Sequence, residues 1–384
     1  MRLANNTKAF LELVNAGLWE DLEFKVDSLK FKDLEGADWD VVLQLAREQS
    51  VVGLMAAGLG HVTDVKIPHG LALKMVSKTL GLEQHNRAKN VFVNELMAEL
   101  EGDGIHALLM KGQGLAQCYE RPLWRASGDI DLLLNEEDYG KARALLMPQA
   151  THVAAEYTDV MHLSMTVKGW IVELHGSVRS EIGKRVDRVI DEIQDNCFGK
   201  GGSRIWMNGT KAIHLPNPDN DVMLVFAHVL QHFFNGGIGL RQICDWMRLL
   251  YTYRESLNYG LLESRIRKAG LMTEWKAFGT LAIEHLGFPK YYMPLLNGSG
   301  KREEVGWKKK ADRILDIVLE TGNLGHNRDS SYHQRHSFLV YKTISFWRTT
   351  KDSVKHGFIF PSDSFRIWWK RLFDGMDRAS KGIT

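Results

Sequence analysis

The sequence predicts an α+β protein in which a mixed β-sheet core is preceded and followed by helical regions. Short apolar runs separated by Lys-Gly, Asn-Gly and Pro residues occur in the middle of the chain and indicate strands joined by turns. Apolar residues spaced three and four apart on both sides of this part indicate amphipathic helices. We therefore divide the chain into a helical N-terminal region (1–100), an α/β core (101–215) and a helical C-terminal domain (216–384).

The composition is that of a globular protein with two or three domains. The chain has 384 residues, of which 44% are apolar and 25% charged, and none of its apolar runs approaches the ~18 residues that a membrane span needs. No apolar signal core follows Met1, so we expect no secretion. The three cysteines, Cys118, Cys197 and Cys244, are widely spaced, which fits a reducing cytoplasm and argues against a zinc site.

Charge is distributed unevenly along the chain. Residues 1–150 contain 16 Lys and Arg against 22 Asp and Glu, a net charge of −6, whereas residues 301–384 contain 17 against 10, a net charge of +7. The basic end could face a polyanion or pack against the acidic front half. Because neither its basic nor its aromatic residues form a nucleic-acid-binding motif, we favour packing within the protein.

The N-terminal region has the spacing of helices. Leu11 and Val14, and later Val42 and Ala46, lie three and four residues apart, and Asp38 or Asp40 is a suitable cap for the second helix. Residues 71–100 form the longest helical pattern of the front half, whereas residues 20–38 are charged and only weakly periodic. The helices could close over a bound molecule or brace the sheet.

The first predicted strand of the core, 105–110, ends in a turn suited to an anion. Lys111 and Gly112 form the turn, and a short apolar segment begins at Gly114. The first N–H groups of a helix have no partner within the helix, so with Lys111 nearby they are suited to bind a phosphate.

The next strand carries two carboxylates. In the run from Gly128 to Leu134, side chains alternate between the two faces, so Asp129 and Asp131 point the same way while Ile130 points into the core. Two carboxylates this close repel each other unless a cation lies between them, and oxygen ligands suit Mg²⁺ or Mn²⁺, which also bind nucleotide phosphates. The alternative is a pair of ordinary polar residues on an open sheet face.

A third carboxylate, Glu173, interrupts the apolar run Trp170–Leu174. This run returns from the strand 161–167 across a Lys168-Gly169 turn, so Glu173 lies on a hairpin that can pair beside the Asp131 strand. A buried carboxylate needs a partner or a metal. We also expect a helix capped by Asn135 and two further strands, 204–207 and 211–215.

These motifs together resemble the nucleotidyltransferase fold of the DNA polymerase β superfamily, and above all its uncharacterised bacterial nucleotidyltransferase family. The resemblance rests on the Lys111-Gly112 turn, the Gly-Asp-Ile-Asp-Leu-Leu strand, the Val-Glu-Leu-His strand, and two helical segments, 228–232 and 239–246. It covers roughly residues 85–250. The superfamily usually has a Gly-Ser pair where this chain has Lys111-Gly112, so Lys111 would replace contacts made by a serine.

The resemblance implies the transfer of a nucleoside monophosphate from an NTP to an acceptor hydroxyl, with release of pyrophosphate. The acceptor would be a small molecule, a sugar, a protein or an RNA. In this interpretation Asp129, Asp131 and Glu173 are catalytic and hold Mg²⁺ or Mn²⁺, and Glu173 also takes the acceptor's proton. The triphosphate would be bound by Lys111, Gly112, Gly114, Arg125 and Arg241. Two alternatives remain: a catalytically degenerate module that binds a nucleotide or partner, and a toxin that modifies RNA or protein.

The C-terminal domain begins after Pro216-Asn217-Pro218, which we expect to exclude helix and central strand. Asp219 is the predicted cap of a helix from about Asn220 to Phe234, and a second helix follows from Gly239 to Tyr253.

Two pairs of side chains share a face on these helices. The spacing of His228 and His232 suits a metal, but without a third ligand in sequence we favour polar lining of a cleft. Arg241 either pairs with Asp245 or reaches a phosphate, and Arg125 could equally be an exposed loop residue. The basic aromatic stretch 365–373 allows peripheral contact with a membrane or partner, but we favour a terminal helix docked by its tryptophans.

Overall fold

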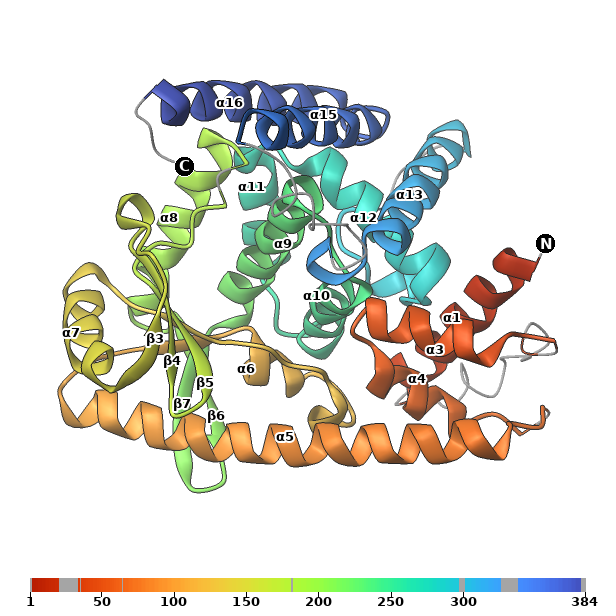
Figure 1. Cartoon of the computed structure of the whole chain (residues 1–384), viewed down its shortest axis with the longest axis horizontal. Coiled ribbons are helices and arrows are strands. Elements are labelled where there is room, and N and C mark those ends of the chain that lie inside the picture. The colour runs from red at the N-terminus through yellow and green to blue at the C-terminus, as the bar shows by residue number, and fades with distance from the viewer. Residues whose placement is uncertain are drawn as a thin grey trace.

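A computed structural model provides the structure, which describes residues 2–20, 34, 36–63, 65–180, 182–296, 301–325 and 338–380. It confirms the α+β class, with a five-stranded mixed sheet set among helices (Figure 1). The division at residues 100 and 215 stays a prediction. Most of the weakly periodic interval 20–38 lies outside the described residues.

Four helices make up the described part of the front of the chain: α1 (Arg2–Leu18), α3 (Trp39–Glu48), α4 (Val52–Leu59) and α5 (His69–Gly102). Asp38 caps α3 as predicted, because its side chain accepts hydrogen bonds from the backbone N–H groups of Asp40 and Val41. Helices α1 and α4 touch backbone to backbone, since a Cβ on Gly58 would meet the Leu13 carbonyl oxygen at 1.9 Å.

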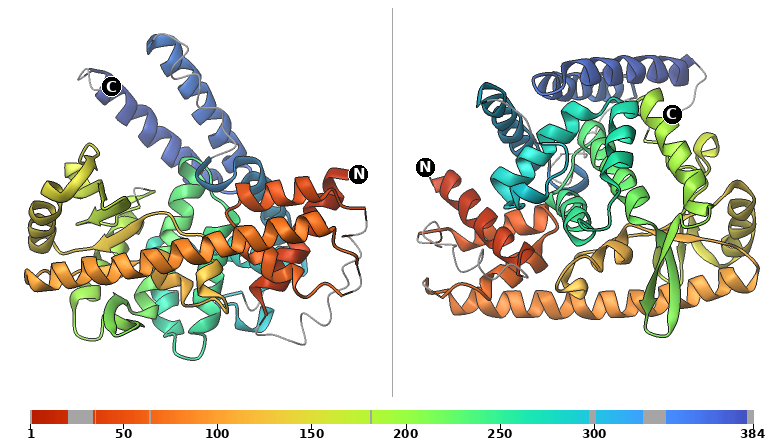
Figure 2. Two further views of the ribbon diagram at one scale, coloured as in Figure 1. Left: turned by 60° about the horizontal axis from the view of Figure 1, so that its bottom comes forward. Right: turned by 180° about the vertical axis from the view of Figure 1, so that it is seen from behind.

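Helix α5 connects the front helices to the sheet. Its 34 residues span about 51 Å at 1.5 Å per residue. Figure 1 shows it along the base of the molecule, beneath α4 at one end and beneath the strands at the other, and Figure 2 shows the same course from two other sides. Leu71 and Met75 pack in the core of the front helices, whereas Phe92, Val93 and Leu96 pack against the sheet.

The five-stranded sheet has the order β1-β2-β5-β4-β3. Only β2 and β5 run parallel, while the other neighbours are antiparallel. The strands are β1 (Leu108–Met110), β2 (Ile130–Leu133), β3 (Ala150–Val153), β4 (His162–Val167) and β5 (Trp170–His175). Strand β1 is shorter than the predicted 105–110 because its ladder with β2 begins only at Leu108. The hairpin of β4 and β5 is confirmed, with Lys168 and Gly169 at positive φ in its turn.

One face of the sheet is covered by α5 and α7 (Glu136–Leu146), which the side chain of Asn135 caps as predicted. The second predicted hairpin, β6 (Ser203–Asn208) and β7 (Lys211–Pro216), forms a separate two-stranded sheet around Gly209, at φ 62°. Helix α8 (Lys184–Phe198) was not predicted, although Val186, Val189, Ile190, Ile193 and Cys197 form its buried face at helical spacing.

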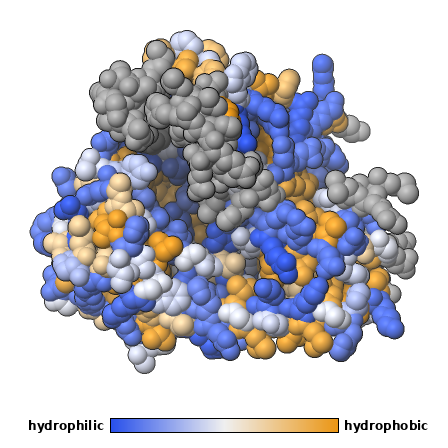
Figure 3. Space-filling view, viewed as in Figure 1, coloured by the Kyte–Doolittle hydropathy of each residue, from blue (hydrophilic) through white to orange (hydrophobic). Residues whose placement is uncertain are grey.

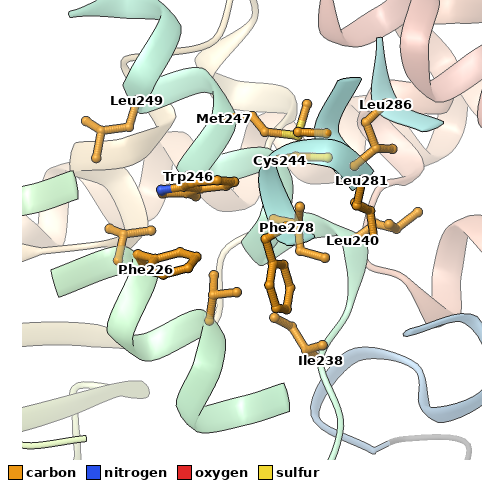
Figure 4. Close-up of a cluster of buried hydrophobic side chains, with 14 of the residues drawn as sticks. Phe226, Ile238, Leu240, Cys244, Trp246, Met247, Leu249, Phe278, Leu281 and Leu286 are labelled. Atoms are coloured by element: carbon orange, nitrogen blue, oxygen red, sulfur yellow. The ribbon is translucent and has the colours of Figure 1, made fainter. Parts of the chain in front are cut away.

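The C-terminal part is helical, as predicted. The described elements are α9 (Pro218–Asn235), α10 (Leu240–Thr252), α11 (Tyr259–Ala269), α12 (Met272–Leu286), α13 (Lys301–Thr321), α15 (Phe338–Gly357) and α16 (Pro361–Ser380). A cluster of buried side chains that includes Phe226, Trp246 and Phe278 joins α9, α10 and α12 (Figure 4).

The start of α9 corrects the predicted boundary. Asn217, and not Asp219, caps the helix, because its side chain accepts a hydrogen bond from the Asn220 N–H at 2.9 Å. The two prolines do not exclude regular structure, since Pro216 is the last residue of β7 and Pro218 the first of α9, where its missing N–H has no role.

The stretch 365–373 lies on α16, and its docking is only partly as predicted. Ile367 is buried, and the Trp368 indole donates to the Thr350 hydroxyl of α15 at 3.0 Å. Trp369 (46%), Phe365 (65%) and Phe373 (52%) are all exposed. The predicted docking by both tryptophans is therefore wrong.

Two expectations about the surface can be compared with the structure. Three basic residues of 301–384, Lys308, Lys355 and Arg366, pair with Glu284, Glu320 and Asp363, which all lie outside residues 1–150. The expected packing of the basic end on the acidic front stays a prediction. Among the described helices, none has the length and apolar character to cross a membrane. The face seen in Figure 3 carries hydrophobic side chains scattered among hydrophilic ones.

Candidate active site

The structure brings the three predicted carboxylates together. Asp131 on β2 and Glu173 on β5 are direct partners across the parallel ladder, and Asp129 lies just before β2. One oxygen of each of the three carboxylates lies within 4.8 Å of the others. They line a cavity of about 500 Å³, which we call the carboxylate cavity.

Strand alternation places these groups. Ile130 and Leu132 point into the core shared with α5 and α7, so Asp131 points to the opposite face. On β5, Val172 and Leu174 point into the same core, and Glu173 emerges beside Asp131. Helix α9 contributes His228 and His232 to the other walls of the cavity.

Asp131 is buried and pairs with two cations through one of its oxygens. Its Oδ1 accepts hydrogen bonds from Lys111 Nζ and pairs with His175 Nε2, both at 3.0 Å. Burial alone would raise the pKa of Asp131, but Lys111 and His175 outweigh burial and hold that pKa well below its usual range. The same contacts act on the cations, since they raise the pKa of Lys111 and that of His175 against the lowering effect of burial.

Two histidines lower the pKa of Glu173 and so keep it ionised. His162 Nε2 lies 3.3 Å and His175 Nε2 3.5 Å from its Oε2. Burial would raise the pKa of Glu173, but hydrogen bonds from both histidines lower it to about 2. A carboxylate with so low a pKa is a good metal ligand and a weak proton acceptor.

Asp129 differs from its neighbours in lacking a cation. Among the described residues, no lysine, arginine or histidine forms an ion pair with it. The charge of Asp131, together with burial, raises the pKa of Asp129. Its surroundings therefore favour an added positive charge.

The donor set of the carboxylate cavity fits Mg²⁺ or Mn²⁺, which prefer oxygen ligands. A second group, His162, Glu173 and His175, also has its ligand atoms within 4.8 Å of one another. Its two imidazole rings are stacked, with centroids 4.7 Å apart and planes 23° apart. Because the lone pair of an imidazole nitrogen lies in the ring plane, stacked rings do not point at one shared ion. The all-oxygen group is the better metal site.

The two predicted arginines line the carboxylate cavity in different states. Arg125 is buried, which excludes an exposed loop residue, and its guanidinium binds both oxygens of Asp245 at 2.6 and 2.7 Å. Tyr119 donates to the same carboxylate at 2.8 Å. Since Asp245 pairs with Arg125, the predicted alternative of an Arg241–Asp245 ion pair is wrong.

Arg241 keeps a free charge next to the carboxylates. Its Nη1 donates to the Ala126 carbonyl at 3.0 Å, and its buried Nε has no hydrogen-bond partner. No described acid forms an ion pair with it. Burial and the charge of Arg125 lower its pKa, so an anion would be a favourable partner.

The glycine turn holds its residues in two environments. Lys111, at φ 50°, and Gly112 line the carboxylate cavity at the start of α6 (Gly112–Ala116), which has only five residues. Gly114 is buried away from the cavity, where an added Cβ would meet Leu215 Cδ2 at 2.9 Å. Its lack of a side chain therefore serves packing.

His228 and His232 lie against each other with ring centroids 4.3 Å apart, and both line the cavity. Burial and the nearby charge of Lys111 lower the pKa of His228 well below its usual value and that of His232 to about 4. In the described part of the chain they belong to no group of three metal-ligating side chains. The structure agrees with polar lining of the cavity.

Helix α5 fixes the loop that leads into Asp129. Asn86 donates to the carbonyls of Leu123 and Arg125 at 2.8 and 2.9 Å. Lys89 Nζ donates to the Ser127 hydroxyl at 2.7 Å and also to the Gly128 carbonyl. Burial lowers the pKa of Lys89 to about 8 against the opposing effect of Asp129.

Several site residues were not predicted. The two-residue period that placed Asp129 beside Asp131 also places His175 beside Glu173, so the sequence held a signal for it. Asn86, Lys89 and His162 gave no such signal, because they reach the site only through the packing of α5 and β4.

Comparison with known proteins agrees with the family predicted from the motifs. No curated protein and no solved structure matches the chain. A family model described as "Uncharacterised nucleotidyltransferase" matches residues 35–287, which is more than half of the chain and extends well beyond 85–250. Placement in the DNA polymerase β superfamily stays a prediction. With the whole sheet, the three carboxylates and both arginines inside the matched range, the chain belongs to the uncharacterised nucleotidyltransferase family.

Proposed function

We propose that the protein is a metal-dependent nucleotidyltransferase that moves a nucleoside monophosphate from an NTP to an acceptor hydroxyl and releases pyrophosphate. The observation that carries this proposal is the meeting of Asp129, Asp131 and Glu173 in one cavity that also contains the free charge of Arg241. Acids that hold a divalent cation and a base that binds phosphate are the parts this reaction needs.

Asp129, Asp131 and Glu173 would hold Mg²⁺ or Mn²⁺. When bound, the ion supplies positive charge to the phosphate oxygens and lowers the pKa of the acceptor hydroxyl. The low pKa of Glu173 supports a ligand role for this residue more than the expected role as proton acceptor.

The chain's own cations would hold the triphosphate. Arg241 is placed to bind it directly, because its charge is not neutralised by a described acid. Lys111 and Gly112 line the same cavity, and Lys111 Nζ lies 3.0 Å from Asp131 Oδ1. Arg125 would act chiefly by fixing the loop, since its guanidinium is already occupied by Asp245.

The test is calorimetric titration with each of the four NTPs in Mg²⁺, in Mn²⁺ and in EDTA, followed by incubation of labelled NTP with cell extract. We expect NTP binding that needs the divalent ion and a labelled acceptor. Equal affinity in EDTA would contradict the metal role. Metal-dependent binding without any labelled product would favour the degenerate binding module.

Glu173→Gln provides the matched test of the third carboxylate. It should keep most of the NTP affinity and lose on the order of a hundredfold or more in transfer rate, as expected when a metal ligand of the reaction is removed. Glu156→Gln is the control, because Glu156 binds Tyr139 and Arg143 outside the cavity. Transfer at the wild-type rate by Glu173→Gln would remove Glu173 from the site.

A further inference from the structure

A second cavity adjoins the carboxylate cavity across Glu173. It measures about 360 Å³, and Lys111, Glu173, His228 and His232 line both cavities. Its outer part is formed by β4, β5 and the loop before β4 on one side and by α9 on the other. A molecule held there would reach Glu173 from the side opposite Arg241, which lines only the carboxylate cavity.

The charges of this second cavity are already neutralised. Its lysine, Lys111, binds Asp131, and its arginine, Arg179, binds both oxygens of Asp191 at 2.7 and 3.0 Å. Among the described residues that line it, every lysine and arginine thus has a carboxylate partner. A phosphorylated or otherwise anionic molecule would find no free cation, in contrast to the cavity with Arg241.

The remaining polar groups suit hydroxyls. Gln231 of α9 and Ser177 after β5 line the second cavity with an amide and a hydroxyl, which both donate and accept hydrogen bonds, and Asn235 adds an amide whose oxygen already accepts from Arg371. Such groups fix the orientation of an uncharged molecule in a pocket.

Three stacked rings form one wall. Tyr157 stacks on His162 with centroids 5.9 Å apart and planes at 18°, and His162 stacks on His175 at 4.7 Å and 23°. A bridge of backbone hydrogen bonds between Tyr157 and His162 holds the outer two rings in register. Tyr157 is 61% exposed, so its outer ring face is available. The stack ends 3.5 Å from Glu173, at His175.

We propose that the second cavity binds the acceptor and that this acceptor is an uncharged sugar. The inference rests on the proposed nucleotidyl transfer and names its acceptor. A sugar ring offers an apolar C–H face to the open face of Tyr157 and hydroxyls to Gln231 and Ser177, and the cavity continues from there to Glu173. The volume lies at the lower end of the roughly 300–1,000 Å³ of small-molecule pockets. An RNA acceptor is disfavoured, because RNA binding depends on cations that meet the phosphates.

The test is saturation-transfer difference NMR on the full-length protein with Mg²⁺ and ATP. The probes are D-glucose, D-mannose, N-acetyl-D-glucosamine and a six-nucleotide oligouridylate. We expect saturation of the ring protons of at least one sugar, and a signal at least fivefold weaker in Tyr157→Ala. Tyr157→Phe should keep the signal because it keeps the ring. Tyr291→Ala, which removes a tyrosine that is 90% exposed and lines neither cavity, is the matched control and should equal wild type.

Three results would overturn the inference: no sugar signal, an equal sugar signal in Tyr157→Ala, or an oligouridylate signal that Tyr157→Ala removes. Calorimetry of ATP binding on the same sample separates the two proposals. Magnesium-dependent ATP binding without a sugar signal overturns the acceptor alone. Loss of magnesium dependence overturns the proposed nucleotidyl transfer itself.

Discussion

At the scale of single residues, Asp129 and Asp131 carry the same charge in opposite surroundings. Asp131 is buried against Lys111 and His175, whereas Asp129 has no described cation partner and is repelled by Asp131. We expect Asp131→Asn to lower the free energy of unfolding by about 3 kcal/mol, because it leaves Lys111 without its acid. Asp129→Asn should change it by less than about 1 kcal/mol, and toward greater stability.

Urea denaturation in EDTA measures this difference without a contribution from bound metal. Both variants should nevertheless lose magnesium-dependent NTP binding. If the two variants had equal stability, the assignment of Lys111 to Asp131 would be wrong.

Substitutions of the two arginines of the carboxylate cavity should likewise differ in their effects on stability and on NTP binding. Arg241→Met should weaken NTP binding tenfold or more while changing stability little, since a charged hydrogen bond is worth about 1.5–3 kcal/mol and every 1.4 kcal/mol is tenfold. Arg125→Met should cost about 3 kcal/mol of stability, because it leaves the buried Asp245 without its cation. Calorimetry and thermal unfolding of both variants check this, and a stable Arg125→Met protein would contradict it.

At this scale, site residues were predictable from the sequence where they follow the two-residue period of a strand. Asp129, Asp131 and Glu173 were predictable because alternation and one hairpin bring them together. The Arg125–Asp245 pair was not, because it joins a loop to a helix 120 residues later, and helical spacing offered Arg241 as the nearer partner.

At the scale of elements, α5 positions the loop that ends in Asp129. We expect Asn86→Ala to cost about 2 kcal/mol, since it removes two buried hydrogen bonds to the loop, and to weaken magnesium-dependent NTP binding although Asn86 does not line the cavity. Gln84→Ala, an exposed position on the same helix, is the control. Lost stability with unchanged NTP affinity would show that the loop keeps its place without Asn86.

Elements were predictable wherever one period dominates, as in α5, α9 and the hairpin of β4 and β5. The ends of elements were harder. Asn217 caps α9, although Asp219 is an equally good capping residue, because Pro218 already fits the first helical turn. The aromatic residues of α16 were overestimated as docking groups, since Phe365, Trp369 and Phe373 are exposed and, of the two tryptophans, only Trp368 hydrogen-bonds to the described part of α15.

At the scale of the whole molecule, a buried acid connects α12 with the terminal helix α16. Glu274 on α12 is 1% exposed, and burial, together with Asp363 of α16, raises its pKa to about 8. Lys310 of α13 acts in the opposite direction, and Arg366 pairs with Asp363. Neither buried carboxylate oxygen of Glu274 has a hydrogen-bond partner, so the neutral, protonated form is favoured, whereas two charged carboxylates would repel each other.

The sign of the pH dependence follows from this raised pKa. Between about pH 4.5 and pH 8 the folded protein keeps the proton of Glu274 and the unfolded chain has lost it, so this group makes stability fall as pH rises. Glu274→Gln should therefore raise the melting temperature at pH 8.5 and flatten its decline between pH 5.5 and pH 8.5. Glu284→Gln, at the exposed end of α12, is the control. A melting temperature that declines equally with pH in wild type and in Glu274→Gln would contradict the raised pKa of Glu274.

The length of α5 limits which changes of sequence the protein can accept during evolution. The helix is anchored by Leu71 near its start and by Leu96 near its end. Between them, Asn86 donates hydrogen bonds to the loop that leads into Asp129. Each inserted residue would turn everything beyond it by about 100° and move it about 1.5 Å, so a single insertion between these anchors would aim Asn86 away from the loop. The contacts of α5 therefore fix both its length and its rotation about its axis. We therefore expect substitutions on its exposed face to be tolerated and insertions or deletions of single residues within it to disrupt the site.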